Sequence, residues 1–164
     1  MGIRKKIIIV SDSHGMNHNL WRVLEKEKPY NMVIHCGDYQ DRESELVKRA
    51  GCDVHIVAGN MDRGDDLPLE KIISLGSHKA LITHGHEYRL YAGLQTLYYS
   101  ALEKEADYVI YGHIHRPVIE VFGGVTFLNP GSITAPRQED GIETYMILLL
   151  MDDGSVNAEI KRMR

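Results

Sequence analysis

The sequence contains little cysteine, no long apolar run and no excess of basic residues. Its two cysteines, Cys36 and Cys52, do not form a Cys-x-x-Cys pair, so free thiols in a reducing compartment are expected rather than a disulfide or a zinc knuckle. The apolar run at residues 7–10 is too short for a signal-peptide core. A content of 43% hydrophobic and 26% charged residues indicates neither disorder nor a membrane span. A cytoplasmic globular protein is therefore expected.

The charge balance also bears on possible partners. The formal net charge is −4, which leaves no basic surface for a polyanion, so stable nucleic-acid binding is not expected. Oligomeric state cannot be read from the sequence, and a homo-oligomer stays open.

Periodicity predicts one domain over residues 1–164, with an α/β (α+β) fold built on two sheets. The early part alternates strands and helices, which is typical of a mostly parallel sheet. The later strands are joined by Gly123-Gly124 and Asp153-Gly154, two hairpin signals, and are expected to be antiparallel. Strands are predicted at residues 7–10, 32–35, 54–58, 71–75, 79–83, 108–111, 118–122, 125–128, 145–151 and 156–160, and helices at 19–28, 42–50 and 90–102.

Metal-competent side chains follow the ends of five of these predicted strands. They are Asp12 and His14, Asp38, Asn60, His84, and His113 and His115. Because ligands bind at the carboxyl ends of strands in open α/β sheets, these loops are expected to meet in one crevice. Each residue alone could be an ordinary turn, cap or loop residue. Their joint placement, nearly always beside a glycine, favours a metal site.

Seven ligands are too many for one ion and too few for two separate sites. If one carboxylate bridges, two ions about 3.5–4 Å apart can each receive four protein contacts. Asp38 is the expected bridge. A mixture of carboxylate, amide and imidazole ligands without thiolate suits Mn²⁺, Fe²⁺ or Zn²⁺.

The ordered motifs resemble those of the calcineurin-like metallophosphoesterases. They are Asp12-x-His14, Gly37-Asp38, Gly59-Asn60-x-Asp62, His84-Gly85-His86 and Gly112-His113-Ile114-His115. The small size and Asn129-Pro130-Gly131-Ser132 are similar to the compact branch of that superfamily, which contains bacterial and archaeal phosphodiesterases and is related in fold to the retromer scaffold subunit. The resemblance implies a four-layer αββα sandwich, with two mixed β-sheets flanked by helices.

The same resemblance implies a metal-dependent phosphodiesterase, in which a water or hydroxide activated by two divalent ions attacks the phosphorus of a small phosphodiester in line. It places Asp12, His14, Asp38 and His115 on one ion and Asp38, Asn60, His84 and His113 on the other. Asp38, Asn60 and His84, with Asp62 and His86, are the implied catalytic residues. Mn²⁺ is the favoured metal, with iron, zinc and nickel as alternatives. The alternative function is a catalytically weak or inactive protein-interaction scaffold on the same fold.

One position departs from the family pattern. Many members carry a histidine after the Gly-Asn pair, where this chain has Met61. A thioether cannot donate a proton, so general acid catalysis is expected to be absent or to come from elsewhere. His86 and His18 are candidates, although a structural role is favoured for each. A substrate with a good leaving group is therefore expected.

Several other residues have two possible roles. Asp62 is either an orienting acceptor for a neighbouring ligand or a turn carboxylate. For Ser132 and Arg137, a loop role is favoured over contact with substrate phosphate. His35 and His55 fall within predicted strands and are expected in the core or behind the ligands, whereas His78 is expected to be exposed in a turn.

Overall fold

The computed structural model describes residues 2–63 and 66–164. Within them the strands are β1 (Ile3–Val10), β2 (Met32–His35), β3 (Asp53–Ile56), β4 (Glu70–Leu75), β5 (His78–Thr83), β6 (Tyr108–Ile110), β7 (Pro117–Phe122), β8 (Val125–Pro130), β9 (Thr144–Met151) and β10 (Val156–Arg162). The helices are α1 (His18–Lys26), α2 (Glu43–Ala50) and α3 (Gln95–Glu103), with a short 3-10 helix, η1, at Leu90–Ala92.

The strands form two mixed five-stranded sheets, in the orders β10-β9-β1-β2-β3 and β4-β5-β6-β8-β7. As predicted, β1, β2 and β3 run parallel, and the β7–β8 and β9–β10 pairs are antiparallel. The expectation that all the later strands are antiparallel is wrong for β8, which lies parallel to β6. The β9–β10 hairpin returns to the first sheet, where β9 pairs antiparallel with β1.

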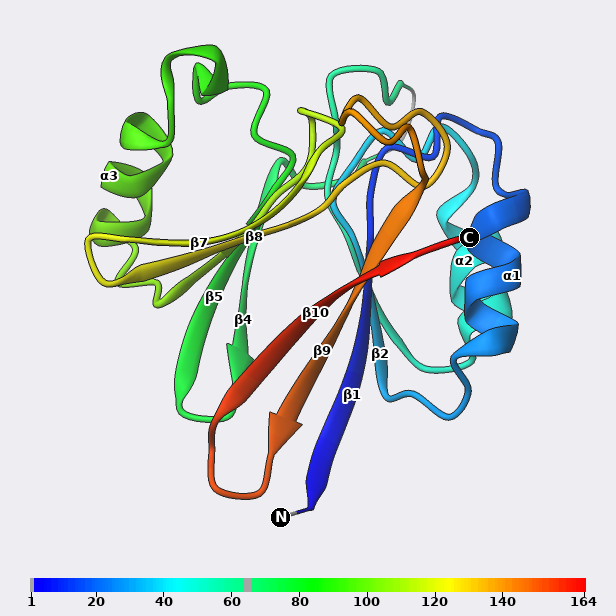
Figure 1. The fold of residues 1–164 in the computed structure, drawn as a ribbon, viewed down its shortest axis with the longest axis horizontal. Helices are drawn as coiled ribbons and strands as arrows, with labels where there is room; N and C mark the ends of the chain where they lie inside the picture. Colours follow the sequence, from blue (N-terminus) through cyan, green and yellow to red (C-terminus); the bar gives the residue numbers. More distant parts are fainter. Residues whose placement is uncertain (1, 64–65) are drawn as a thin grey trace.

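The two sheets pack face to face, and helices cover their outer faces (Figure 1). Side chains alternate along β1, because successive residues of a strand point to opposite faces. Ile7 and Ile9 belong to the core between the sheets, whereas Ile8 and Val10 pack in the layer that includes residues of α1 and α2. On the other side, α3 covers the second sheet. The predicted αββα sandwich is confirmed.

Two local predictions differ from the structure. The apolar spacing from Leu90 to Leu102 predicted one helix, but η1 ends at Ala92 and α3 begins only at Gln95. Gly93 lies between them with a φ of 106°, a conformation that interrupts a helix and that glycine adopts without a steric penalty. His78 begins β5 instead of lying in the turn, since it pairs with Leu75 of β4.

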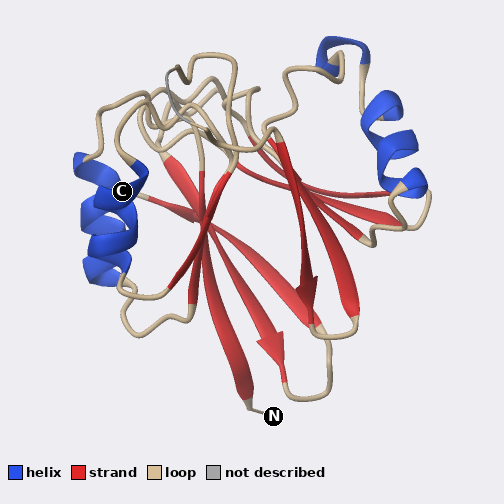
Figure 2. Ribbon diagram, turned by 180° about the vertical axis from the view of Figure 1, so that it is seen from behind, coloured by secondary structure: helices blue, strands red, loops and turns tan. Residues whose placement is uncertain are grey.

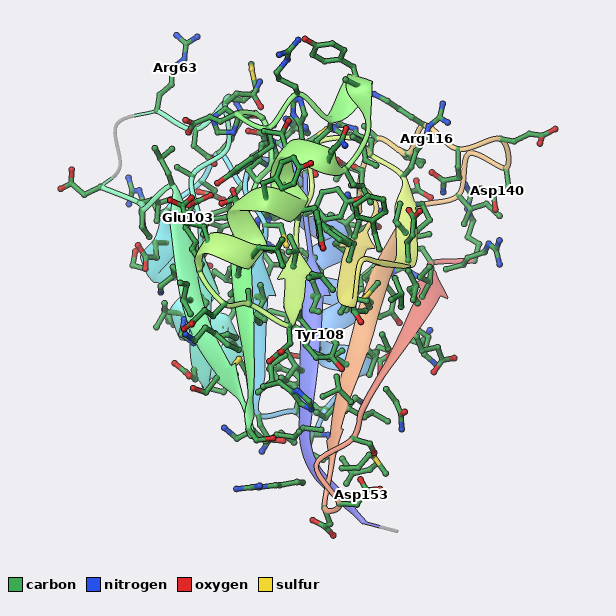
Figure 3. The ribbon with its side chains drawn as sticks, turned by 90° about the vertical axis from the view of Figure 1, so that its left-hand side faces the viewer. Arg63, Glu103, Tyr108, Arg116, Asp140 and Asp153 are labelled. Atoms are coloured by element: carbon green, nitrogen blue, oxygen red, sulfur yellow. The ribbon has the colours of Figure 1, made fainter. Side chains whose placement is uncertain are left out.

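The loops that follow β1, β2, β3, β5 and β6 gather at one end of the sandwich (Figure 2). The β9–β10 turn, marked by Asp153, lies at the opposite end, while Arg63 and Arg116 lie at the loop end (Figure 3). None of the helices in the described residues is long and apolar enough to cross a membrane.

Candidate metal centre

All seven side chains predicted to bind metal lie in the loops at this end. Asp12 and His14 follow β1, Asp38 follows β2, and Asn60 follows β3. His84 follows β5, and the pair His113 and His115 follows β6. The first four residues therefore come from one sheet and the last three from the other, so the candidate site spans both sheets.

Five of these residues have a left-handed backbone, which is uncommon outside glycine. They are Asp12, His14, Asp38, His113 and His115, with φ between 51° and 71°. Each such residue costs on the order of 1–3 kcal/mol, and such residues cluster at functional sites. Aspartate and histidine tolerate this conformation better than most residues. At these five positions the loops adopt backbone conformations that are energetically unfavourable. Such strain is typical of a functional site.

Two glycines let the loops approach the carboxylates closely. A Cβ atom on Gly112 would lie 2.1 Å from Ser11 Oγ and 2.8 Å from an oxygen of Asp12. A Cβ atom on Gly59 would lie 2.1 Å from Asp38 Oδ1. Both distances are far below van der Waals contact, so any larger residue would displace a candidate ligand.

Each carboxylate uses one oxygen for the protein and turns the other toward the imidazoles. Asp12 Oδ2 accepts from the Ser11 hydroxyl at 2.5 Å and from the His113 N–H at 3.1 Å. Asp12 Oδ1 is buried and has no hydrogen-bond partner among the described residues. Asp38 Oδ1 accepts from the Met61 N–H at 2.8 Å, while Asp38 Oδ2 lies 3.2 Å from His84 Nε2. An orphaned buried carboxylate oxygen is expected where a cation belongs.

Three imidazoles are oriented through their Nδ1 atoms. The Nδ1–H groups of His14, His84 and His115 donate to Gln40 Oε1, the Cys36 carbonyl and the Ala135 carbonyl, each at 2.7 Å. In a neutral ring such a bond fixes the tautomer and leaves the Nε2 lone pair for a metal ion, which is the usual arrangement of a metal-binding histidine. Without a metal ion, contacts with Asp38 and Asp12 outweigh burial and raise the pKa of His84 and of His115, so these two rings also pair with the carboxylates as cations. The Nε2 atoms of His14 and His84 face both inward carboxylate oxygens, and that of His115 faces Asp12 Oδ1.

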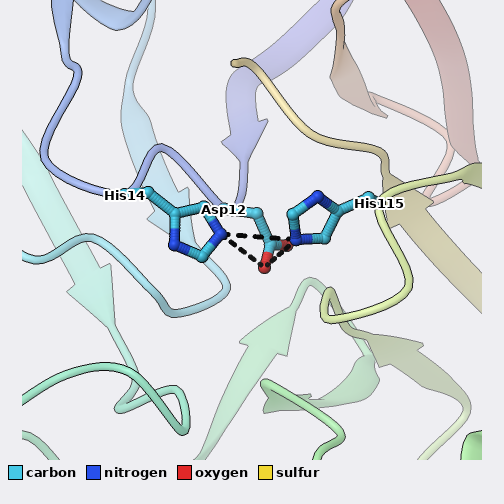
Figure 4. Close-up of side chains that lie close together, drawn as sticks. All are labelled: Asp12, His14 and His115. Atoms are coloured by element: carbon cyan, nitrogen blue, oxygen red, sulfur yellow. Dashed lines mark hydrogen bonds and ion pairs between the residues drawn. The ribbon is translucent and has the colours of Figure 1, made fainter. Parts of the chain in front are cut away.

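The first group of donor atoms has the dimensions of a metal site (Figure 4). His115 Nε2 lies 3.3 Å from both His14 Nε2 and Asp12 Oδ1, and His14 Nε2 lies 3.9 Å from Asp12 Oδ1. The centre of such a triangle is about 2 Å from each corner, the usual length of a bond from zinc to nitrogen or oxygen.

A second group surrounds His84. Its Nε2 lies 3.1 Å from Asn60 Oδ1, 3.2 Å from Asp38 Oδ2 and 3.8 Å from Asp12 Oδ1. The His113 ring stands edge-on to the His84 ring with 5.1 Å between centroids. Asp38 Oδ2 is also 3.9 Å from His14 Nε2, so it faces both groups, as the expected bridge must. Asp12 Oδ1 faces both groups as well.

The electrostatics of the cluster favour bound cations. Burial alone would raise the pKa of Asp38, but the contact with His84 and the Met61 N–H outweigh it and lower the pKa to about 2. The pKa of Asp12 is lowered too, because His115 and His84 outweigh its burial. Burial and the neighbouring His84 lower the pKa of His113. The site therefore offers two ionised carboxylates, and neutral His113 has a free lone pair.

Asp62 connects two of the ligand loops. Its Oδ2 accepts from the N–H groups of Asp38 at 2.8 Å and Gly59 at 2.7 Å, and its Oδ1 accepts from Gln40 N–H at 2.8 Å. These bonds fit both roles considered for Asp62, because the carboxylate orients the backbone of Asp38 and also closes the turn that begins at Gly59. It holds the backbone that presents Asp38.

His86 lies beside the cluster rather than within it. Its ring centroid is 5.4 Å from that of His84 and 6.3 Å from that of His113, and its Nδ1 is buried without a hydrogen-bond partner. His35 is a core histidine as expected: it is fully buried, and burial lowers its pKa to about 4. Its Nδ1 accepts from the Gly37 N–H, so its Nε2–H donates to Ser13 Oγ at 2.9 Å.

The loop of Asp12 is supported by residues that the sequence did not connect with it. The hydroxyls of Ser132 and Thr134 both donate to the Asp12 carbonyl, at 2.8 and 2.9 Å. Asn129 Nδ2 donates to the Gly112 carbonyl at 3.0 Å. The favoured loop role of Ser132 is thus confirmed, and the Asn129-Pro130-Gly131-Ser132 motif, which was noticed only as a family feature, is the signal that could have revealed this support.

The donor set of the described residues fits divalent metal ions, because oxygen and nitrogen donors converge, the carboxylates are ionised and no thiolate takes part. A sequence model of the calcineurin-like phosphoesterase superfamily domain matches residues 6–153. The chain belongs to this superfamily. Among curated members, it is 38% identical over 152 residues to "Probable metallophosphoesterase YsnB" of Bacillus subtilis, covering 91% of this chain and 86% of that protein.

Solved structures of several other proteins share the fold. A predicted phosphoesterase from Streptococcus pneumoniae has a TM-score of 0.79 and 32% identity, covering 99% of both chains. Two further structures are less than 25% identical to this chain in sequence, so their likeness concerns the fold alone. One is an archaeal phosphodiesterase, with a TM-score of 0.72, 24% identity and coverage of 95% and 99% of the two chains. The other is Zn²⁺-complexed Vps29 from Entamoeba histolytica, with a TM-score of 0.74, 23% identity and coverage of 97% and 99%.

Proposed function

We propose that the protein is a metal-dependent phosphodiesterase whose two divalent ions are held by the seven residues of the candidate centre. The observation that carries this proposal is the convergence of Asp12 Oδ1, Asp38 Oδ2 and three Nε2 atoms whose Nδ1–H groups are already bonded. Membership of the phosphoesterase superfamily supplies the reaction class. When bound, the ions would supply Lewis-acid stabilisation of phosphate oxygens and an acidified water for in-line attack on phosphorus.

The protein's own residues determine how the ions and the substrate are presented. Asp38, placed between the two donor groups, would serve as the bridge. Asn60 is exposed, whereas Asp12, Asp38 and His84 are buried. The centre therefore opens to solvent on the side of Asn60, and we propose that the substrate enters there.

The preference for diesters with good leaving groups rests on Met61. This residue is exposed and lines a pocket of about 430 Å³ next to Asn60, together with Gln40, Asp41, Arg42, Asp62 and Arg63. None of these six side chains is an ordinary proton donor at neutral pH. An alkoxide leaving group would depart without assistance there, so an aryl ester is the better substrate.

Mn²⁺ is the proposed metal. The two carboxylates and the amide oxygen of Asn60 are hard donors, which Mn²⁺ accepts alongside imidazole, and no cysteine sulfur takes part. Iron, zinc and nickel could occupy the same donors. Loading the protein with each metal in turn would rank them.

The test is an assay of bis(4-nitrophenyl) phosphate hydrolysis after chelation and after metal is added back. We expect chelation to abolish activity, Mn²⁺ to restore it, and Asp38→Asn to lower kcat/KM at least about a hundredfold, because a bridging anion is lost. Glu103→Gln, which changes an exposed carboxylate on α3 (Figure 3), is the matched control and should retain activity.

Activity that neither chelation nor Asp38→Asn affects would overturn the proposal. No activity with any of the four metals would favour the alternative function, a protein-interaction scaffold on the same fold.

A further inference from the structure

Three arginines line a pocket that borders the candidate metal centre. The pocket has a volume of about 380 Å³, and its walls include His86, Arg89, Tyr91, His113, Arg116 and Arg137. We call this the arginine pocket. It lies on the side of His113, whereas Met61 lines a different pocket.

The residues that line the arginine pocket are adjacent to candidate metal ligands. Arg116 follows His115 in the chain, and the Arg137 N–H donates to the His115 carbonyl at 2.9 Å. His113 forms part of the wall itself. A group bound in this pocket would therefore lie next to a phosphate held at the metal centre.

The positive charge of the pocket is not neutralised within the described residues. Arg49, Arg162 and Arg164 each pair with a carboxylate, but no ion pair involves the three arginines of the pocket. Nor does a carboxylate belong to its lining. The pocket beside Met61 differs, since Asp41 and Asp62 line it along with Arg42 and Arg63.

Arg89 is an exposed residue with an unfavourable backbone conformation. Its backbone is left-handed, with a φ of 51°, which is uncommon for a long side chain. Arg89 Nε donates to the Tyr91 hydroxyl at 3.1 Å, and its guanidinium lies 5.8 Å from the centroid of the Tyr91 ring. The terminal amino groups of the guanidinium keep their donors for a ligand.

We propose that the arginine pocket binds a second phosphate of the substrate, so that the preferred substrates are phosphodiesters that carry a further terminal phosphate. Guanidinium groups match phosphate oxygens in a bidentate geometry, and a dianion suits several cations better than a singly charged carboxylate does. The inference rests on the proposed function for the scissile phosphate and adds the recognition of a second group.

Two probes with the same scissile bond test this inference. Thymidine 5′-(4-nitrophenyl phosphate) carries only the diester, and its 3′-phosphorylated form adds a terminal phosphate. We expect the second probe to have a KM about tenfold lower with a similar kcat, because the added contact exists in both ground and transition states. In Arg116→Gln and Arg137→Gln the ratio of the two KM values should fall below about threefold.

Arg63→Gln is the matched control, because Arg63 lies at the same end of the molecule as Arg116 but lines the other pocket (Figure 3). It should leave the ratio between the probes unchanged. Equal KM values for the two probes in the wild type, or a ratio lost in Arg63→Gln and kept in Arg116→Gln and Arg137→Gln, would overturn the arginine pocket as the second phosphate site.

A binding measurement separates this inference from the proposed function. Calorimetry on the Mn²⁺-loaded protein compares thymidine 3′,5′-bisphosphate with thymidine 5′-phosphate. Tighter binding of the bisphosphate that Arg137→Gln abolishes, without turnover of either probe, would support the pocket and contradict the phosphodiesterase. Turnover of both probes with equal KM values, together with equal binding of the two nucleotides, would support the phosphodiesterase and contradict the second phosphate site.

Discussion

The histidines differ in what their Nδ1 atom does. In His14, His84 and His115 it donates to an oxygen, which turns the Nε2 lone pair toward the carboxylates. In His35 it accepts the Gly37 N–H, so the buried ring turns its Nε2–H to Ser13 in the loop after β1. The sequence separated these two classes, since candidate ligands follow strands and His35 lies within one. It could not predict the acceptors, because they lie in loops distant in the chain.

Met61 stands where many members of the superfamily are expected to carry a histidine, and introducing a histidine there tests its role. In Met61→His, an imidazole beside Asn60 could protonate a departing alkoxide. We expect kcat for methyl 4-nitrophenyl phosphate to change less than about threefold, because 4-nitrophenolate leaves readily without being protonated. The rate for a dialkyl phosphodiester should rise roughly 10- to 100-fold.

The comparison is made under the same metal loading, and Met61→Gln serves as the control because it is polar but cannot act as an acid. Equal effects of Met61→His on aryl and alkyl esters would contradict a role of position 61 in protonating the leaving group.

At the scale of elements, Asp62 holds the loops after β2 and β3 together. Both of its oxygens accept backbone N–H groups. In Asp62→Asn the new amide NH₂ must face at least one N–H, whichever way it is turned, so one donor loses its partner. We expect metal affinity to fall about 10- to 100-fold, as is usual when a group behind a metal ligand is changed. Equilibrium dialysis with Mn²⁺ measures it.

Asp53→Asn is the matched control, since Asp53 is exposed at the start of β3. Its metal affinity should equal that of the wild type. Unchanged affinity in Asp62→Asn would show that the two loops keep their positions without this carboxylate.

Element boundaries show where local patterns fail. The spacing of Leu90, Leu94 and Leu97 fits one helix, yet Gly93 separates η1 from α3. The prediction found all of β2, which is buried throughout, and the buried half of β1 at residues 7–10, because both are rich in β-branched residues. It missed the first half of β1, which is mostly exposed and carries no such signal. Arg89, which lines the arginine pocket, has a left-handed backbone that the hydrophobic spacing could not predict.

At the scale of the whole molecule, the candidate centre joins two sheets. Hairpin signals predicted β9 and β10, but they could not predict that this hairpin returns beside β1, because sheet membership depends on contacts distant in the sequence. The prediction that the strand-end loops meet needed only the general rule for α/β sheets. The sequence therefore indicated the location of the site better than the strand order.

Metal binding should stabilise the fold, because the ligands come from both sheets. A ligand present at about 100 times its Kd stabilises the native state by about 2.7 kcal/mol. For a chain of this size, that corresponds to a rise in Tm of roughly 5–10 °C. Differential scanning calorimetry with and without Mn²⁺ measures the change. Asp12→Asn should lose most of it, and Glu103→Gln should retain it. A Tm that does not respond to metal would contradict a centre that joins the sheets.

The division of His113 and His115 between two ions is the most direct test of the central claim. Anomalous diffraction from crystals soaked in Mn²⁺ should show two peaks about 3.5–4 Å apart in the wild type. His115→Ala should lose the peak beside Asp12 and His14, and His113→Ala the peak beside Asn60 and His84. A single peak in the wild type, or loss of the same peak in both variants, would contradict the dinuclear centre.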